Sequence, residues 1–454
     1  MFYLYRLSFL GEDDIVGSFG AHWRHTGRWW YTLAHVCQRW RNIILGSATY
    51  LDLSLVCTYD APVARMLAHS PPLPPVIGYF TKGRKLTKED EEGTILALGQ
   101  HDSVRRVRLG NSLALQKIIM AMNEEYPILE YLYIMLPTED NSTILAFQET
   151  LQTPHLRHLT LQGFTLPMSS QLLTTAVGLV TLHLAMVHPS TYFHPNTLIQ
   201  WISLMPQLET LKIYFRLSIP NRDIERQLAP SPIIAPITLP NLRHFHFRGV
   251  SAYSEALFRR IIGPRLEKIQ IEFFDQLTFS VPYLLQFINT AENLSFRNAV
   301  LTFSDKLVGA GVYPPGETKV FALSIVVKCW HLDWQVSSMA QISNSLSQIF
   351  SAVERLVLQH DVHSSSSEEH NDVDRTEWHE LLRPFSNVKT LRIQKGLVKD
   401  ISRCLQLAGE EQSLAVLPEL HELTYFGSGD TRAAFTSFIN ARRKAGRPVA
   451  LIRL

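Results

Sequence analysis

A short apolar pattern that recurs ten times after residue 103 constrains the fold of this sequence more than any other feature. Each copy has an apolar residue at its first, fourth and sixth positions, so its second half alternates as a half-buried strand does. One such strand cannot bury its apolar side alone, and neighbouring copies must pack against one another. The copies are Val104/Val107/Leu109, Leu129/Leu132/Ile134, Leu156/Leu159/Leu161, Leu179/Leu182/Leu184, Leu208/Leu211/Ile213, Leu242/Phe245/Phe247, Leu266/Ile269/Ile271, Val353/Leu356/Leu358, Val388/Leu391/Ile393 and Leu420/Leu423/Tyr425.

The copies are spaced like structural repeats. Their first residues lie 23 to 34 residues apart up to Leu266, and 35 and 32 residues apart from Val353 onwards. Segments with helical periodicity precede many of the strands, and a proline often separates the two, as at Pro206 and Pro418. Helix, turn and short strand at this period are typical of leucine-rich repeats. We therefore predict an α/β fold in which residues 103–454 form an irregular leucine-rich-repeat solenoid with a parallel sheet on its concave side.

Three parts of this region depart from the pattern. Between residues 272 and 352 the pattern fades, and apolar segments such as 300–303 predict two degenerate repeats there. Residues 362–375 are polar and acidic, which predicts a disordered surface loop. Residues 431–454 predict a final helix and a short strand that cap the array. The alternative to the whole solenoid is a set of ordinary amphipathic strands in a non-repetitive α/β domain.

Composition and charge exclude several classes of protein. Hydrophobic residues make up 46% of the chain and charged residues 19%, which predicts a folded protein with an ample core. A net charge of +2 gives no overall attraction to nucleic acid or to a membrane surface. The longest apolar stretch, 320–329, is shorter than the roughly 20 residues of a membrane-spanning helix, and the N-terminus lacks a signal-peptide cleavage pattern. We predict a cytoplasmic and/or nuclear protein without a membrane or nucleic-acid partner.

No constellation of residues predicts catalysis, a metal site or a cofactor. Four histidines between residues 360 and 379 stand near acidic residues but lack the spacing of ligands fixed on a helix. Gly309 and Gly311 lack the rest of a dinucleotide-binding motif. The cysteines are far apart in apolar surroundings, which predicts buried reduced thiols, and we predict that the protein is not an enzyme. The four cysteines are Cys37, Cys57, Cys329 and Cys404.

The segment before the repeats predicts an amphipathic helix. Residues 29–44 carry apolar side chains at positions 29, 33, 36, 37, 40 and 44, and basic side chains fall on the opposite side. This pattern alone would indicate only a helix that packs on one face.

Three motifs in and around this segment add a family resemblance. They are Val36-Cys37-x-x-Trp40-Arg41, the following Leu51-Asp-Leu-Ser-Leu-Val-Cys57, and the proline-rich Pro71-Pro-Leu-Pro-Pro75. Together they resemble the F-box and post-F-box region of a large group of mushroom-forming fungal F-box proteins. The likeness covers roughly residues 1–80 well and the repeat region loosely. Residues 1–6 look like the end of the family's first helix, whose usual Leu-Pro opening does not appear in this sequence.

The resemblance implies a function. In that family a small helical unit docks on the Skp-type adaptor of cullin-RING ubiquitin ligases, and the repeats select a protein substrate. Residues 1–57 would then be an F-box-like helical segment and 58–102 a connecting region. The missing opening implies either that the sequence is truncated there or that the adaptor contact is weak because it has fewer apolar anchors. A repeat scaffold that recruits no ligase is the alternative function. The residues implied in adaptor binding are Phe2, Leu4, Val36, Cys37, Trp40 and Arg41.

The repeat strands also predict a partner-binding surface. Residues that alternate with the buried positions of each strand project from the concave side. They include seven Lys and Arg residues, opposed by Glu272 and Glu422, which predicts a basic face for an acidic or phosphorylated protein segment. The alternative is that these are solvated strand residues without a partner or that a loop covers them. The predicted binding residues are Arg106, Arg108, Tyr131, Tyr133, His158, His183, Lys212, Tyr214, His244, His246, Arg248, Lys268, Arg355 and Arg392.

Overall fold

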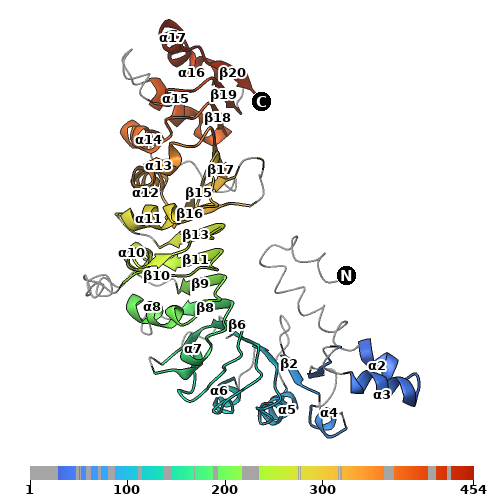
Figure 1. The fold of residues 1–454 in the computed structure, drawn as a ribbon. Coiled ribbons are helices and arrows are strands. Elements are labelled where there is room, and N and C mark those ends of the chain that lie inside the picture. The colour runs from blue at the N-terminus through green and yellow to red at the C-terminus, as the bar shows by residue number, and fades with distance from the viewer. Residues whose placement is uncertain are drawn as a thin grey trace. The chain divides into compact units, whose positions relative to one another are not determined.

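The structure is a computed structural model, and its described part forms two compact units. The first unit comprises Met1–Phe193 with Leu204–Leu208, and the second comprises His194–Ser203 with Glu209–Leu454. In each unit helices cover one face of a sheet of short strands (Figure 1), and we call the face that the described helices leave uncovered the open face. The structure describes residues 29–47, 51, 53–57, 63–69, 73–79, 87–110, 115–135, 145–167, 169–187, 193–216, 235–274, 276, 278–314, 316, 320–361, 373–406, 416–426 and 431–454.

The first unit contains a parallel sheet of six strands that follow one another in chain order. Apolar motif residues of neighbouring strands lie side by side, as Leu132 does with Val107 and with Leu159, and all three are fully buried. The parallel sheet and the buried fourth and sixth positions confirm the predicted stacking in this unit. The strands are β1 (Leu55–Cys57), β2 (Pro75–Tyr79), β3 (Arg106–Gly110), β4 (Tyr131–Met135), β6 (His158–Gln162) and β8 (Thr181–Val187), with a small two-stranded sheet of β5 (Leu145–Ala146) and β7 (Phe164–Thr165).

The helices of this unit are α2 (Trp29–Ala34), α3 (Gln38–Gly46), α4 (Val63–His69), α5 (Lys88–Leu98), α6 (Leu115–Met120) and α7 (Gln171–Thr175). From α4 onwards the helices connect successive strands on one side of the sheet, whereas α2 and α3 precede β1. Thr87 caps the N-terminus of α5, and its side chain accepts a 3.2 Å hydrogen bond from the backbone N–H of Asp90. The side chain of Asp90 in turn accepts a 3.0 Å hydrogen bond from the backbone N–H of Thr87. This capping box satisfies donors that a helix start otherwise leaves free.

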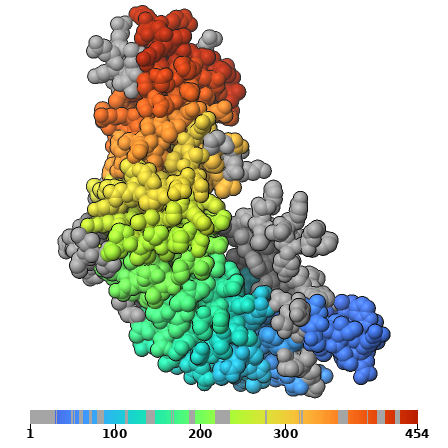
Figure 2. Space-filling model, in the orientation of Figure 1, coloured from blue at the N-terminus to red at the C-terminus, as the bar shows by residue number. Residues whose placement is uncertain are grey.

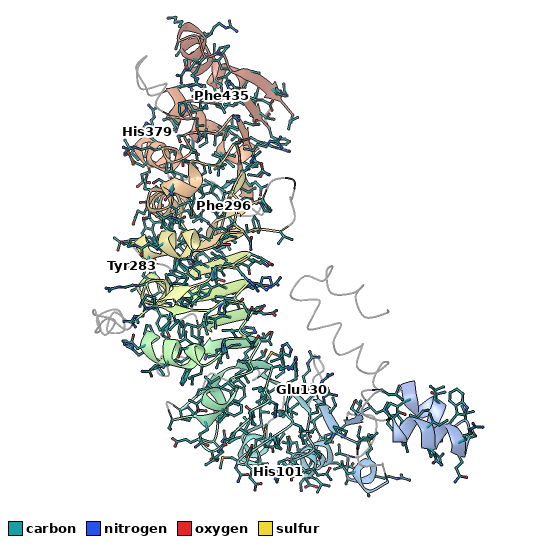
Figure 3. The ribbon with its side chains drawn as sticks, in the orientation of Figure 1. His101, Glu130, Tyr283, Phe296, His379 and Phe435 are labelled. Atoms are coloured by element: carbon teal, nitrogen blue, oxygen red, sulfur yellow. The ribbon has the colours of Figure 1, made fainter. Side chains whose placement is uncertain are left out.

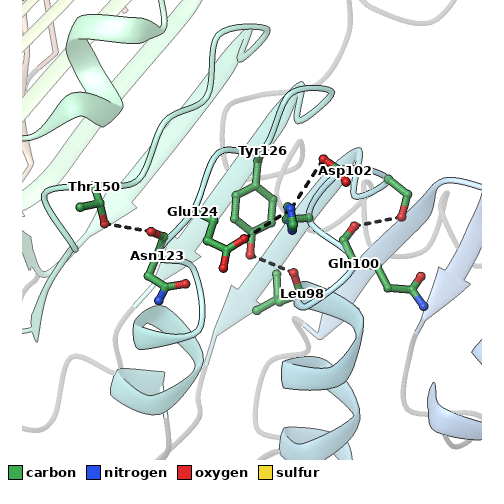
Figure 4. A network of polar contacts seen from close by, with 9 residues as sticks. Leu98, Gln100, Asp102, Asn123, Glu124, Tyr126 and Thr150 are labelled. Atoms are coloured by element: carbon green, nitrogen blue, oxygen red, sulfur yellow. Dashed lines mark hydrogen bonds and ion pairs between the residues drawn. The ribbon is translucent and has the colours of Figure 1, made fainter.

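Polar contacts hold the turns between neighbouring repeats of the first unit (Figure 4). The hydroxyl of buried Tyr126 donates a hydrogen bond of 3.0 Å to the carbonyl of Leu98 at the end of α5. Burial raises the pKa of Tyr126, so the phenol stays protonated as this donor requires. His101 Nε2 lies 3.3 Å from a carboxylate oxygen of Glu124 in the same network. The contacts fix the chain where one repeat passes into the next.

The parallel sheet begins earlier than the predicted boundary at residue 103. Leu55 pairs with Pro75, and Ile77 pairs with Val107, so β1 and β2 continue the ladder of the later strands. The predicted connecting region 58–102 is therefore wrong, because it holds helices and a strand of the same repeat type. These strands escape the pattern because, in register with β3, Ser54 and Pro74 stand where the motif has its first apolar residue.

The predicted single helix over residues 29–44 is also wrong. The chain forms α2 and α3, with Cys37 in an extended conformation between them. The Nε–H of Arg41 donates a 3.2 Å hydrogen bond to the carbonyl of Ala34, which the end of α2 leaves without a helical partner. Cys37 is exposed, so the prediction of a buried thiol fails there, whereas the other three cysteines are buried and all four are free.

The second unit has a sheet of ten strands. Its successive parts form bands whose colour runs from green through yellow to red in Figure 2. All its neighbouring strands pair in parallel except at β15. In order along the sheet they are β9 (Thr210–Phe215), β11 (His244–Gly249), β13 (Lys268–Phe273), β16 (Leu323–Lys328), β15 (Leu307–Tyr313), β14 (Asn298–Ser304), β17 (Arg355–Asp361), β18 (Thr390–Ile393), β19 (Glu422–Tyr425) and β20 (Ala450–Arg453), with a separate pair of β10 (Ile237–Thr238) and β12 (Ile261–Ile262).

Strands β14, β15 and β16 replace the two degenerate repeats predicted between residues 272 and 352. They form an antiparallel meander whose outer strands each pair in parallel with the rest of the sheet. The predicted repeats are wrong because residues 304–307 turn the chain back after β14, where a repeat would place a helix. The buried row nevertheless continues, since Leu301 pairs with Ala310 and Ala310 with Ile325.

The helices of the second unit lie on one side of its sheet, and Tyr283 and His379 project from this helical layer in Figure 3. The final helix buries Arg442 completely, where its guanidinium donates hydrogen bonds to the carbonyls of Pro418, at 2.9 Å, and Leu420, at 3.1 Å. The helices are α8 (Pro195–Ser203), α10 (Ser251–Phe258), α11 (Pro282–Asn289), α12 (Leu332–Ser345), α13 (Ser347–Phe350), α14 (Arg375–Leu382), the 3-10 helix η2 (Lys395–Leu397), α15 (Val398–Gln406), α16 (Thr431–Ala434) and α17 (Thr436–Lys444).

Ion pairs join the second motif position of neighbouring repeats. Their side chains are partly exposed, so each pair contributes at most about 1 kcal/mol to stability. The buried apolar rows therefore hold the sheet together, and the ion pairs mainly help to fix the register of neighbouring repeats. They are Arg105–Glu130 at 3.0 Å, Arg243–Glu267 at 3.1 Å and Lys389–Glu354 at 3.5 Å.

Candidate functional site

The open face is built by the alternation of each strand. In β9, Lys212 and Tyr214 point away from the core, whereas Leu211 and Ile213 are fully buried. All fourteen residues predicted to line the concave side lie on strands, at positions that alternate with core residues. Parallel pairing then sets them in rows across neighbouring strands.

The open face of the first unit is lined by aromatic and basic side chains packed on each other. Arg106 lies beside Tyr131, and Arg108 beside Tyr133. The guanidinium of Arg108 is 5.1 Å from the centre of the Tyr133 ring, and this side chain is only 4% exposed. Burial lowers the pKa of Arg108 and raises the pKa of Tyr131 to about 12. Arg108 is therefore part of the packing rather than a freely offered cation.

Two histidines, on β6 and β8, continue this line of side chains across the open face of the first unit. His158 lies beside Tyr131, and its Nδ1 is 3.2 Å from the hydroxyl of Thr181 on β8. His183 lies on the same strand as Thr181 and beside Thr160. Arg106 has a nearby carboxylate, since one of its nitrogens is 3.9 Å from Glu130. The charge of this part of the face is thus partly balanced from within the chain.

The first three strands of the second unit place a cluster of basic residues on the open face. His246 lies beside Lys212, and its Nδ1 is 3.4 Å from the hydroxyl of Tyr214. His244 Nδ1 is likewise 3.3 Å from the hydroxyl of Thr210. His246 is almost fully buried between its neighbours, which sequence alone did not indicate.

Glu272 offsets part of this positive charge. One of its carboxylate oxygens lies 3.3 Å from Nε of Arg248 and 2.9 Å from Nζ of Lys328. Lys328, at the end of β16, was missed in the predicted site because it follows no copy of the motif. Lys328 lies on this face because β16 belongs to the meander. The alternation of residues 323–328 was the only sequence signal for that position.

Three cations of the second unit remain available on the open face. Within the described residues, Lys268, Arg355 and Arg392 make no ion pair with a carboxylate. Arg355 and Arg392 are exposed, and the guanidinium of Arg392 lies 4.8 Å from the centre of the Phe426 ring. Unpaired guanidinium groups held in place are suited to bind carboxylate or phosphate oxygens.

The N-terminal helices present a second candidate surface. Val36 is 62% exposed, Trp40 48% and Ile43 57%, on α3 and the turn before it. The inward side of the pair instead buries Trp30, Ala34 and Ile44. Of the residues implied in adaptor binding, Val36, Cys37, Trp40 and Arg41 lie at the surface, and Phe2 and Leu4 lie outside the described residues.

In the described parts of the chain, no group of three or more His, Cys, Asp or Glu residues is placed to hold a metal ion. His363 and His370 lie outside those parts. None of the described helices is both long enough and apolar enough to span a bilayer.

Comparisons with known proteins leave the family open. No protein-family model matches the sequence, and no curated protein matches it either. One solved structure that matches is the leucine-rich repeat-containing protein LegL7 from Legionella pneumophila, at 10% identity and a TM-score of 0.25, covering 87% of this chain and 97% of that one. At this TM-score the likeness carries no argument, so the repeat fold rests on the strand register described above.

Proposed function

We propose that this protein is a non-catalytic repeat receptor whose open face captures an acidic or phosphorylated segment of another protein. The observation that carries the proposal is the exposure of Arg355 and Arg392 on neighbouring strands β17 and β18, where neither makes an ion pair with a carboxylate of the described residues. Exposed side chains on the same face offer donors without the cost of breaking an internal ion pair. Lys268, on β13, is a further cation on the open face of this unit.

Charge reversal at these two arginines should remove binding. A fluorescein-labelled ten-residue peptide with six glutamates is the probe, and the same peptide with glutamines is the neutral comparison. We expect the R355E/R392E double variant to bind the acidic peptide at least tenfold more weakly than the wild-type protein, measured by fluorescence anisotropy. Raising the salt concentration should weaken the wild-type complex, because the contact is electrostatic and partly exposed.

A matched control separates a local site from general attraction. The R383E/R443E variant changes the net charge by the same amount, but at an exposed residue just after α14 and another in α17. It should keep the affinity for the acidic peptide within twofold. An equal loss in both double variants, or equal binding of the glutamine peptide, would contradict a binding site on the open face.

We propose in addition that the N-terminal helices recruit a Skp-type adaptor, which would make the protein a substrate-recognition subunit of a cullin-RING ubiquitin ligase. The F-box resemblance and the exposed apolar residues Val36, Trp40 and Ile43 support this role. Exposed large apolar side chains that gather on one helix commonly mark a protein-binding surface. A repeat scaffold that recruits no ligase is the competing proposal.

Adaptor binding distinguishes the two roles. The full chain is mixed with a purified Skp-type adaptor and the complex is followed by gel filtration and calorimetry. We expect the wild-type chain to bind, and V36D or W40D to weaken the complex at least tenfold, because a carboxylate would be buried in an apolar contact. L96D, at a 52% exposed leucine of α5, is the control that should bind normally. Absence of wild-type binding favours the scaffold.

A further inference from the structure

The middle of the open face in the second unit is uncharged and consists of small and medium-sized residues. On the three strands of the meander, the side chains that face away from the core between the strand ends carry no ionisable group. This stretch separates the basic cluster on β9, β11 and β13 from the arginines on β17 and β18. The outward residues are Val300, Thr302, Gly309, Gly311, Ser324 and Val326.

Two aromatic rings lie on this stretch. A Cβ added to Gly311 would overlap the ring of Phe321, so the glycine makes room for the aromatic side chain above the sheet. The ring of Phe321 packs against Tyr313, with centroids 4.3 Å apart. Both side chains remain partly exposed, so the two rings offer an apolar surface next to the uncharged outward residues of the meander.

Cations stand at both ends of the aromatic pair. Lys268 and Ala322 directly precede the paired residues Ile269 and Leu323, which places Lys268 beside the start of β16. At the other end, Asn298 pairs with both Tyr313 and Arg355. Lys268 on β13 and Arg355 on β17 are thus four strand spacings apart, or about 19 Å at about 4.8 Å per spacing.

This arrangement defines the chemistry of a binding partner. An extended peptide advances about 3.3 Å per residue, so roughly six residues span the distance between the two cations. A uniformly anionic chain would match the ends but would place its charges over the apolar middle, where they lose water without gaining a partner. A segment with an apolar side chain between two acidic groups matches all three parts.

We infer that the meander is a specificity pocket for an aromatic or large aliphatic side chain, flanked by acidic residues about six positions apart, in a segment of a partner protein. The inference rests on the proposed acidic-segment receptor and adds the central apolar requirement. Phe321 and Tyr313 contact the apolar side chain, and Lys268 and Arg355 contact the acidic groups. The neutral floor excludes a third charge from the centre.

Three fluorescein-labelled ten-residue peptides test the inference with the full chain. The first has glutamate pairs six positions apart and a central phenylalanine, the second has serine at the centre, and the third is acidic throughout. We expect the wild-type protein to bind the first peptide at least tenfold more tightly than the second. In F321A this preference should fall to twofold or less, while affinity for the all-acidic peptide stays within twofold of wild type.

A second variant, on β16, tests the same peptide preference. V326S changes an outward residue of β16 and should reduce the same preference, and circular dichroism checks that each variant folds. If acidic peptides bind without regard to the central residue, the receptor proposal stands and the pocket is overturned. If no acidic peptide binds, both are overturned. Tighter binding of a labelled ten-nucleotide thymidine strand than of any peptide would overturn the peptide pocket in favour of nucleic acid.

Discussion

The F245A variant is expected to lower the free energy of unfolding of the second unit by about 4 kcal/mol, within the range for truncating a buried phenylalanine. Phe245 occupies the fourth motif position in β11 and is fully buried. Its ring lies 5.4 Å from that of Phe258 on α10 and 5.3 Å from that of Phe287 on α11, both edge-on. One strand residue therefore ties together the helices of two successive repeats, and its loss leaves a cavity between them.

Urea unfolding of the whole chain measures this effect, and F245L is the matched control. Leucine is the usual residue at this motif position, so F245L fills most of the space and should cost about 1 to 1.5 kcal/mol. Phe258 and Phe287 stack at 4.9 Å and would keep their contact in both variants. A loss below 1.5 kcal/mol in F245A would show that the site collapses or that the packing differs from this structure.

Phe245 also illustrates what the sequence could predict. The ten motif strands follow from two periods, because an apolar alternation sets which side is buried and a recurring spacing sets which strands are neighbours. The β14–β16 meander follows neither. Its core residues Leu301, Ala310 and Ile325 lie on strands with the expected alternation of buried and exposed residues. The pattern within one strand does not determine whether its neighbour runs parallel or antiparallel.

The candidate site, too, could be predicted from the sequence only in part. Alternation placed Arg108 on the open face of the first unit and His246 and Arg355 on that of the second, as the strands show. It could not tell that Arg108 and His246 are almost fully buried whereas Arg355 is exposed, because that depends on residues one strand away. Glu272, by contrast, was expected to oppose the positive charge, and it does so through Arg248.

Burial of a carboxyl group in the helical layer gives the second large effect. Glu255 on α10 accepts hydrogen bonds from the backbone N–H groups of Tyr283, at 2.7 Å, and Leu284, at 3.1 Å, in the first turn of α11. The residue before α11, Val281, has no side chain able to cap these donors, and Pro282 has no N–H of its own. Glu255 of the preceding repeat therefore serves as the cap, although only 9% of it is exposed.

This position predicts that the protein loses stability as the pH rises from about 4 to about 7. Burial raises the pKa of Glu255 to about 7, and the two backbone hydrogen bonds only partly oppose the shift. The unfolded chain has the ordinary carboxyl pKa, so the folded state binds the proton more tightly. The stabilising effect is complete below about pH 4 and is lost as the pH rises through about 7.

The E255Q variant tests this linkage, because a glutamine keeps the shape of the protonated acid and cannot ionise. Relative to the wild-type protein, its free energy of unfolding should rise by about 2 kcal/mol between pH 5 and pH 8, since the wild type alone must ionise a buried group. E292Q, at an exposed glutamate after α11, should show little change over the same range. A difference between E255Q and wild type that stays constant with pH would mean that Glu255 remains charged in the folded protein, with the two N–H donors outweighing the cost of burial.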